Sequence, residues 1–166
     1  MSIITKTGNG GESRFLGGMV SKGGVGMEAI GALDELSATL QVAKSKIKNQ
    51  KSKLNSKLKN IIEDLWGIMG EMATGKRVIS YKLRVMSLEK EIEETEKKLP
   101  KQNKFLIFEK EGAVYLNWAR TVARRAERRL VKYYKKCQNL DPNILIYINR
   151  LSDYLFIKAR EVEYKS

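Results

Sequence analysis

Apolar side chains recur every three or four residues along most of this chain, and this spacing limits its fold more than any other feature. The pattern covers five segments, at about residues 27–47, 54–73, 82–99, 112–138 and 141–163. Apolar positions with this spacing lie on one face of an α-helix. Only short connections separate the segments, and no stretch is rich in strand-forming residues. The sequence therefore predicts an all-α fold, a five-helix antiparallel bundle.

Glycine is concentrated near the start of the chain, whereas both prolines lie late. We therefore expect residues 1–26 to form a glycine-rich, largely irregular arm before a helical bundle at 27–166, within one domain spanning 1–166. The segment TKTGNGGESR, residues 5–14, combines hydroxyls, a lysine and three glycines. Such a backbone can point several N–H groups at phosphate oxygens, although it does not end in the Gly-Lys-Ser/Thr of a Walker A loop. A disordered N-terminal tail is the alternative.

The charge balance limits the class of partner. The chain of 166 residues has a formal net charge of +13, no histidine and a single cysteine, Cys137. This charge favours an anionic partner: nucleic acid, an acidic membrane or a phosphorylated small molecule. Without histidine, any chemistry must use Arg, Lys, Asp, Glu, backbone amides or a bound cofactor. No apolar run reaches the roughly 18 to 20 residues that span a bilayer, and the N-terminus does not resemble a secretion signal, so we expect a cytoplasmic protein.

The segment ARTVARRAERRLVKYYKK, residues 119–136, carries Arg or Lys at eight positions. At 100° per residue, Arg120, Arg124 and Glu127 form a row that flanks the apolar stripe of the helix. Three other cations of this segment lie roughly opposite the apolar stripe: Arg125, Arg129 and Lys132. A nucleic-acid-binding helix would more naturally spread its cations over the face farthest from the core. The row could bind a compact anion, or it could contain only an ordinary Arg124–Glu127 ion pair.

The last helical segment repeats this arrangement. Asn149 and Asp153 lie one turn apart, and Arg160 follows on the same face. The residues predicted to face the core are Ile148, Leu151 and Leu155. An amide beside a cationic row could read a nucleobase edge or a phosphate, but Asn149 could also be an ordinary surface residue.

Two further stretches leave alternatives open. The apolar run FLIF at 105–108 could shield a bound ligand or belong to the core. The lysine-rich stretch at 44–59 contains no aromatic residue, so base stacking has no support there. It is either a solvated helix end with a linker or a binding surface.

Four motifs, TKTGNGG, AIGALDELS, ARTVARRAERR and NRLSDYLF, resemble the PduO-type ATP:corrinoid adenosyltransferases. They occur in the family's order and extend from Thr5 to Arg160. The resemblance implies a five-helix bundle that assembles as a homotrimer with active sites between subunits. It also implies transfer of the 5′-deoxyadenosyl group of ATP to the cobalt of a reduced corrinoid, with release of triphosphate.

The resemblance also implies roles for individual residues. Asp34 would pair with Arg120 across the subunit interface, and these two with Arg124 would be the catalytic residues. Phe105 would shield the lower face of the corrin, with Phe108 as the other candidate for that contact. The implied ATP-binding residues are Thr5, Lys6, Thr7, Gly8, Ser13, Arg14, Lys22, Arg124, Arg125, Glu127, Arg128 and Asn149.

The implied cofactors and partners follow from the same resemblance. ATP, Mg²⁺ bridging its phosphates and a reduced corrinoid would bind, whereas no metal-ligating residue, nucleic acid or membrane contact is expected. An electron-donor protein and an adenosylcobalamin-dependent mutase would be further partners.

The chain departs from the family pattern at several positions. Asn9 replaces the usual aspartate of TGDGG, Ser37 follows DEL in place of asparagine, and the histidine before ARTV is replaced near Asn117. The residues at Gly26-Met27 and the sequence FEKEG after the apolar run also differ. These departures affect the fine placement of the site and the rate, while the core of the implied ATP site remains. The alternatives to the enzyme are a basic helical nucleic-acid-binding protein and a helical adaptor without catalysis, in which the arginine rows form interface ion pairs.

Overall fold

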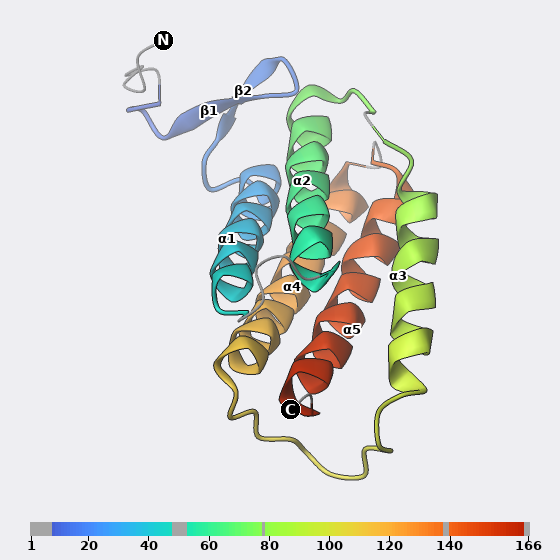
Figure 1. The fold of residues 1–166 in the computed structure, drawn as a ribbon. Coiled ribbons are helices and arrows are strands. Elements are labelled where there is room, and N and C mark those ends of the chain that lie inside the picture. The colour runs from blue at the N-terminus through green and yellow to red at the C-terminus, as the bar shows by residue number, and fades with distance from the viewer. Residues whose placement is uncertain (1–7, 48–52, 78, 138–139, 165–166) are drawn as a thin grey trace.

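The computed structural model describes residues 8–47, 53–77, 79–137 and 140–164. These residues contain the predicted five helices (Figure 1), namely α1 Val25–Ser45, α2 Lys53–Thr74, α3 Tyr81–Glu96, α4 Glu111–Lys136 and α5 Pro142–Tyr164. Successive helices run in alternating directions, as the sequence predicts for an antiparallel bundle. α4 packs between α1 and α5, whereas α3 lies against α5 and runs parallel to it.

The N-terminal arm is more regular than the sequence predicts. Strands β1 (Glu12–Phe15) and β2 (Gly18–Ser21) form an antiparallel hairpin, so the expectations of an irregular arm and a purely helical fold are wrong here. Leu16 and Gly17 make the turn with φ of 51° and 78°, the left-handed conformation that two-residue hairpins favour. Strands of four residues are too short to produce a convincing alternation in the sequence.

The hairpin is attached to the bundle. The backbone N–H of Leu16 donates to the carbonyl of Ala73 in α2 at 2.7 Å. Phe15 is buried and meets the ring of Tyr133 in α4 edge-on, with ring centroids 6.0 Å apart. α1 begins at Val25, two residues before the expected start of the bundle.

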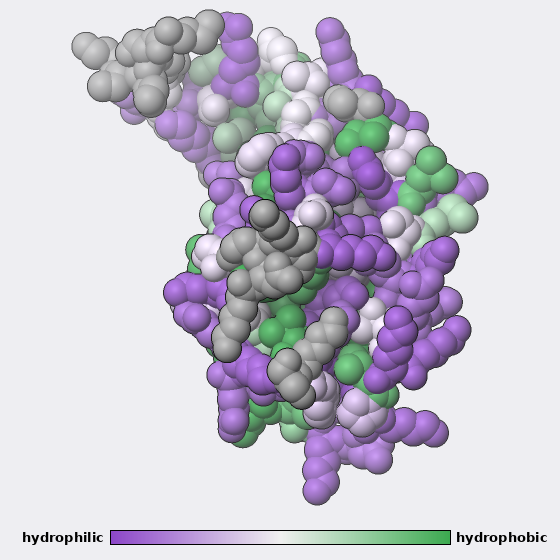
Figure 2. All heavy atoms as spheres, viewed as in Figure 1, coloured by the Kyte–Doolittle hydropathy of each residue, from purple (hydrophilic) through white to green (hydrophobic). Residues whose placement is uncertain are grey.

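The predicted apolar faces form the core. The buried side chains of the α4 stripe are Ala119, Val122, Ala123, Ala126, Leu130 and Tyr133. From α5, Ile148, Leu151 and Leu155 are buried as expected. Fully burying one leucine or isoleucine side chain contributes about 1.5–3 kcal/mol. The face seen in Figure 2 is mostly hydrophilic, and none of the described helices is long and apolar enough to cross a membrane.

A buried polar cluster joins three helices. Asp64 of α2 is only 4% exposed, and its Oδ2 accepts a hydrogen bond from the Tyr147 hydroxyl of α5 at 3.0 Å. Its Oδ1 pairs with Nε of Arg84 in α3 at 3.1 Å, and the hydroxyl of Tyr81 donates to its backbone carbonyl. Burial raises the pKa of Asp64, although the Tyr147 hydroxyl and the Arg84 charge both oppose that shift. We call these four residues the Asp64 cluster.

Candidate functional site

The arginines of α4 fall into two groups, one paired with carboxylates of α1 and one without an ion pair among the described residues. Arg125 pairs with Glu35 and Arg129 pairs with Glu28, so both bind carboxylates of α1. Arg120, Arg124 and Arg128 have no ion pair with any carboxylate in the described part of the chain, and we call these three residues the open row. The i,i+3 pair between Arg124 and Glu127 is likewise not found there. The alternative of an ordinary helix-surface ion pair is therefore not supported.

Arg120 is held in place without a counter-charge. Its Nε donates to Oδ1 of Asn117 at 2.8 Å, and its guanidinium carbon lies 5.8 Å from the centroid of the Phe156 ring. Burial, followed by the nearby charge of Arg124, lowers the pKa of Arg120. Two crowded cations that repel each other favour an anion between or beside them.

Asn149 of α5 contacts Glu127 of α4, three residues after Arg124, whereas the sequence alone leaves open whether it is an ordinary surface residue. Its Nδ2 donates to Oε1 of Glu127 at 2.8 Å, while its Oδ1 accepts from Nη1 of Arg150 at 2.9 Å. Nε of Arg150 donates in turn to Oε1 of Glu89 in α3 at 2.8 Å. The structure thus brings Asn149 together with Glu127, one residue from Arg128.

A cleft of about 340 Å³ opens next to Arg120 and Arg124. The connection between α3 and α4 forms one wall and α5 forms another. Its aromatic side chains include Phe108 and Phe156, whose rings meet edge-on with centroids 6.3 Å apart. The full lining is Gln102, Phe105, Leu106, Phe108, Asn117, Arg120, Arg124, Ser152, Asp153 and Phe156. A cleft with cations at one side and aromatic rings at the other suits a ligand that is anionic at one end and apolar at the other.

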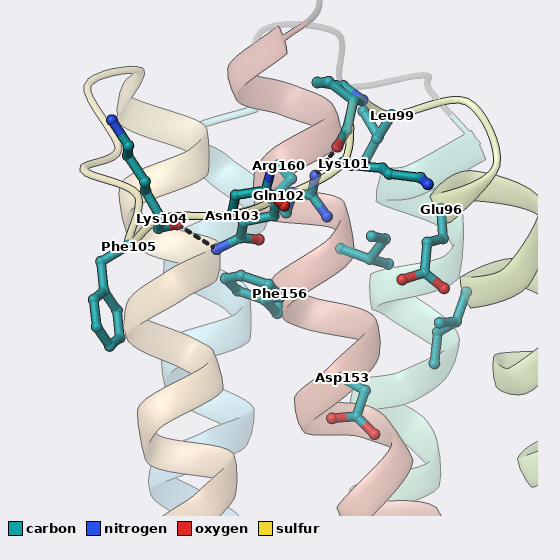
Figure 3. Close-up of a pocket in the computed structure, with 13 residues that line it drawn as sticks. Glu96, Leu99, Lys101, Gln102, Asn103, Lys104, Phe105, Asp153, Phe156 and Arg160 are labelled. Carbon is teal, nitrogen blue, oxygen red and sulfur yellow. Dashed lines mark hydrogen bonds between the residues drawn. The ribbon is translucent and has the colours of Figure 1, made fainter.

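A second cleft of about 820 Å³ adjoins the first and shares Gln102, Phe105, Asp153 and Phe156 with it (Figure 3). Arg160 lies on its α5 wall, is 5% exposed and donates from Nη2 to the carbonyl of Pro100 at 2.6 Å. Its Nε has no hydrogen-bond partner among the residues that the structure describes. The connection carrying Phe105 is therefore tied to α5 by Arg160.

The apolar run at 105–108 is neither a strand nor simply core. Phe105 and Ile107 are almost completely exposed, whereas Leu106 and Phe108 are partly buried. Figure 3 shows the Phe105 ring projecting from the connection, away from Arg160. Phe105 thus has a free ring face for a ligand, and Phe108 has its ring against Phe156.

The other predicted residues lie apart from this site within one chain. In the arm, Nζ of Lys22 donates to the carbonyl of Gly8 at 2.7 Å, while Ser13 and Arg14 lie in β1. Thr5, Lys6 and Thr7 fall outside the described residues, so their predicted role is not tested. The hairpin and the α3–α4 connection lie at opposite ends of the bundle (Figure 1).

Asp34 is exposed on α1, and no described residue forms an ion pair with its carboxylate. Its predicted partner, Arg120, faces Phe156 of the same chain. The Asp34–Arg120 pair is therefore absent within the described chain, and the predicted pairing across an interface stays a prediction.

Five site residues were not predicted individually from the sequence: Glu89, Gln102, Arg150, Ser152 and Phe156. Arg150 directly follows Asn149, and Phe156 lies one helical turn after Asp153, so their positions next to predicted residues were a usable signal. Glu89 and Gln102 reach the site only through tertiary packing, which no local pattern indicates.

An antiparallel helical bundle with Arg120 and Arg124 at the edge of a partly aromatic cleft is suited to an anionic ligand. The sequence profile of the cobalamin adenosyltransferase family matches residues 3–162, and the chain belongs to that family. It is 34% identical over 172 residues to the corrinoid adenosyltransferase of Bacillus subtilis, covering the whole chain and 89% of that relative. It is also 36% identical to the corrinoid adenosyltransferase PduO of Citrobacter freundii. That alignment covers 96% of this chain but only 49% of PduO.

Solved structures agree with this family. An arginine-to-lysine variant of the PduO-type ATP:co(I)rrinoid adenosyltransferase from Lactobacillus reuteri, complexed with ATP, superposes with a TM-score of 0.91 at 31% identity. The match covers 98% of this chain and 94% of that chain. A phenylalanine-to-histidine variant from the same organism, complexed with cobalamin and ATP, gives a TM-score of 0.91 at 30% identity over 98% and 91% of the two chains.

Proposed function

We propose that this protein transfers the 5′-deoxyadenosyl group of ATP to the cobalt of a reduced corrinoid and releases triphosphate. The observation that supports this most directly is the open row, of which Arg120 and Arg124 border a cleft with an aromatic wall. Family membership and the ATP and cobalamin complexes of related proteins support the same reaction.

The reaction needs no side-chain nucleophile. Cobalt in the +1 state supplies the electron pair that attacks the ribose 5′-carbon, and the bond from that carbon to the triphosphate oxygen breaks. Cobalt ends formally at +3, and the electron pair of the broken bond leaves on triphosphate. A chain without histidine is compatible with this chemistry because no proton has to be removed from the nucleophile.

The open row stabilises the leaving group. Arginine binds phosphate oxygens through two parallel N–H groups, and such charge-assisted bonds strengthen as charge accumulates on the departing oxygen. We assign this role to Arg124 and Arg128, with Lys6, Lys22 and the other predicted arm residues completing the phosphate site. Mg²⁺ would arrive as part of the MgATP substrate, bound to the phosphates.

Phe105 would shield the corrin. Its ring is fully exposed at the border of both clefts, so it can lie against a flat apolar ligand. Displacing water and the axial ligand from cobalt would ease reduction from Co(II) to Co(I), which needs one electron from a separate donor.

A complete site would combine two subunits of a homotrimer. The arm lies at the end of the bundle opposite the α3–α4 connection that lines the cleft, and Asp34 and Arg120 do not pair among the described residues of one chain. Trp118 and Val114 are exposed on the helix that carries Arg120, as expected for a subunit contact. Asp34 of one subunit would then order Arg120 of the next and align cobalt with the 5′-carbon.

The test is anaerobic mixing of the protein with MgATP and chemically reduced cobalamin or a corrinoid precursor, followed by visible spectroscopy. Formation of a light-sensitive alkyl-cobalt spectrum with release of triphosphate is the expected result. ATP binding without conversion of any reduced corrinoid would contradict the reaction. Binding of nucleic acid that weakens steeply with salt, without ATP binding, would favour the nucleic-acid alternative.

A further inference from the structure

The side-chain amide of Asn149 is held at both of its ends. Its Nδ2 donates to Oε1 of Glu127 at 2.8 Å, and its Oδ1 accepts from Nη1 of Arg150 at 2.9 Å. A carboxylate only accepts hydrogen bonds and a guanidinium only donates them. These two neighbours therefore determine the orientation of the amide, with Nδ2 toward Glu127 and Oδ1 toward Arg150.

Arg150 is itself held by α3. Nε of Arg150 donates to Oε1 of Glu89 at 2.8 Å, and Nη1 lies 3.4 Å from Oδ2 of Asp153. A continuous series of polar contacts thus joins Glu89, Arg150, Asn149 and Glu127, crossing from α3 through α5 to α4. The series ends three residues from Arg124 along α4.

After these two bonds, Asn149 retains one N–H and one oxygen lone pair for a ligand. Phosphate oxygens can only accept, and the carboxylate of Glu127 beside the amide would repel them. The edge of adenine offers an amino donor next to a ring-nitrogen acceptor, and this pattern matches the carboxamide of asparagine. The amide therefore suits the base of a nucleotide better than its phosphates.

We propose that Arg150, held by Glu89, is a positioning residue that orients the amide of Asn149 to read the adenine of bound ATP. This inference rests on the proposed function and deepens it by assigning the two ends of the ATP site. Asn149 and Glu127 mark the end that binds the base, and the open row marks the end that binds triphosphate. Inosine triphosphate presents an acceptor where adenine presents a donor, so correct orientation of Asn149 discriminates against it.

The test compares Arg150→Met with a matched control, Lys57→Met. Lys57 of α2 pairs with Glu91 of α3 at 2.7 Å, so its removal also weakens the attachment of α3 without touching Asn149. Equilibrium binding of ATP and of inosine triphosphate is measured by calorimetry without corrinoid. The affinity ratio should favour ATP in the wild type, fall about fivefold or more in Arg150→Met and stay unchanged in Lys57→Met.

Glu89→Gln supplies a second, milder variant that leaves Arg150 in place. It should lower the ATP-to-inosine-triphosphate affinity ratio less than Arg150→Met does. The double variant Glu89→Gln/Arg150→Met should have the same ratio as Arg150→Met alone, because Glu89 acts through Arg150. With reduced cobalamin, KM for ATP should rise in Arg150→Met more than kcat falls. If Arg150→Met does not fold, the ratio in Glu89→Gln decides.

An unchanged ratio in folded Arg150→Met, even with weaker binding of both nucleotides, would overturn the proposal. An equal fall in Lys57→Met would also overturn it, because the cause would then be loosened packing of α3. A wild type that binds no ATP overturns both the inference and the proposed function. A wild type that binds ATP but adenosylates no corrinoid overturns the reaction alone, and the binding ratios still decide the inference.

Discussion

The Asp64 cluster joins α2, α3 and α5, whereas the open row lies on α4, and the two differ in how far their charges are satisfied. In the Asp64 cluster, the carboxylate is 4% exposed and meets Tyr147 at 3.0 Å and Arg84 at 3.1 Å. In the open row, Arg120 and Arg124 meet no carboxylate of the described residues, and burial, followed by the nearby charge of Arg124, lowers the pKa of Arg120. A buried carboxylate with its hydrogen-bond and charge partners in place stabilises the fold. Neighbouring cations without a counter-charge repel each other, and a bound anion reduces that repulsion.

The largest effect is expected from Arg124→Ala, in the open row. Losing a charge-assisted bond to triphosphate should lower kcat/KM for ATP about 10- to 100-fold. The free energy of unfolding should change by less than about 0.5 kcal/mol, because the side chain is exposed and forms no ion pair with a described residue. Steady-state kinetics with reduced cobalamin and urea denaturation measure the two quantities. A large loss of stability with unchanged ATP kinetics would reverse the roles assigned to the two regions.

The opposite behaviour is expected from Tyr147→Phe, in the Asp64 cluster. The variant leaves Oδ2 of Asp64 buried without its donor, which should lower the free energy of unfolding by about 1–3 kcal/mol. KM for ATP should stay at the wild-type value. Tyr164→Phe is the control, because Tyr164 is exposed at the end of α5 and its hydroxyl can be solvated. Equal effects of the two substitutions would show that the Asp64 cluster is not the source of the stability.

High pH should lower the stability of the fold through its buried tyrosines, without involving the open row. Burial, with the nearby carboxylates of Asp64 and Glu91 respectively, raises the pKa of Tyr147 and Tyr154 above the ordinary value. Unfolded tyrosine loses its proton near pH 10, so above that pH the unfolded state binds fewer protons and stability falls. The stabilising contribution is complete below about pH 10 and decreases by up to about 1.4 kcal/mol per tyrosine for each further pH unit.

The measurement follows tyrosinate absorbance and helical circular dichroism through an alkaline titration. Part of the tyrosinate signal should appear only as the helical signal is lost. Arg124→Ala should follow the wild-type curve, and Tyr147→Phe should show a weaker dependence of stability on pH. Complete ionisation of the tyrosines before any loss of helix would be incompatible with this expectation.

The sequence predicts the open row better than the Asp64 cluster, and the reason is physical. Helical angles follow from the sequence alone, so the separation of Arg124 from Arg125 and the inward faces of Ile148 and Leu151 could be predicted. The Asp64 cluster depends on three helices meeting at one carboxylate, and nothing near Asp64 in the sequence specifies Arg84 or Tyr147 as its partners.

The remaining differences also come from contacts distant in sequence or from very short elements. Glu127 accepts from Asn149, which is 22 residues away, so its neighbour Arg124 did not determine its pairing. The hairpin of four-residue strands is fixed by the contact of Leu16 with Ala73, which the glycine-rich composition conceals. The assembly and the role of residues 5–7 rest on the family resemblance.

The smallest expected effects lie between the two extremes, at Arg125 and Arg129. Their pairs with Glu35 and Glu28 are partly exposed, and such pairs contribute about 0.2–1 kcal/mol that salt reduces. Arg129→Ala should lower stability by this amount at low salt and leave KM for ATP unchanged. Arg125 belongs to the predicted ATP site, but Glu35 already occupies part of its guanidinium. Arg125→Ala should therefore match Arg129→Ala in stability and raise KM for ATP by no more than about threefold.

Salt titration of both variants makes this comparison quantitative. If the effect of Arg125→Ala on KM reached that of Arg124→Ala, a paired arginine would bind triphosphate as strongly as an unpaired one. The ion pairs of α4 within the chain would then not indicate which side of this helix binds the nucleotide. If both variants differ from the wild type only in salt-dependent stability, the side facing α1 is structural and the open row alone supplies the phosphate contacts from this helix.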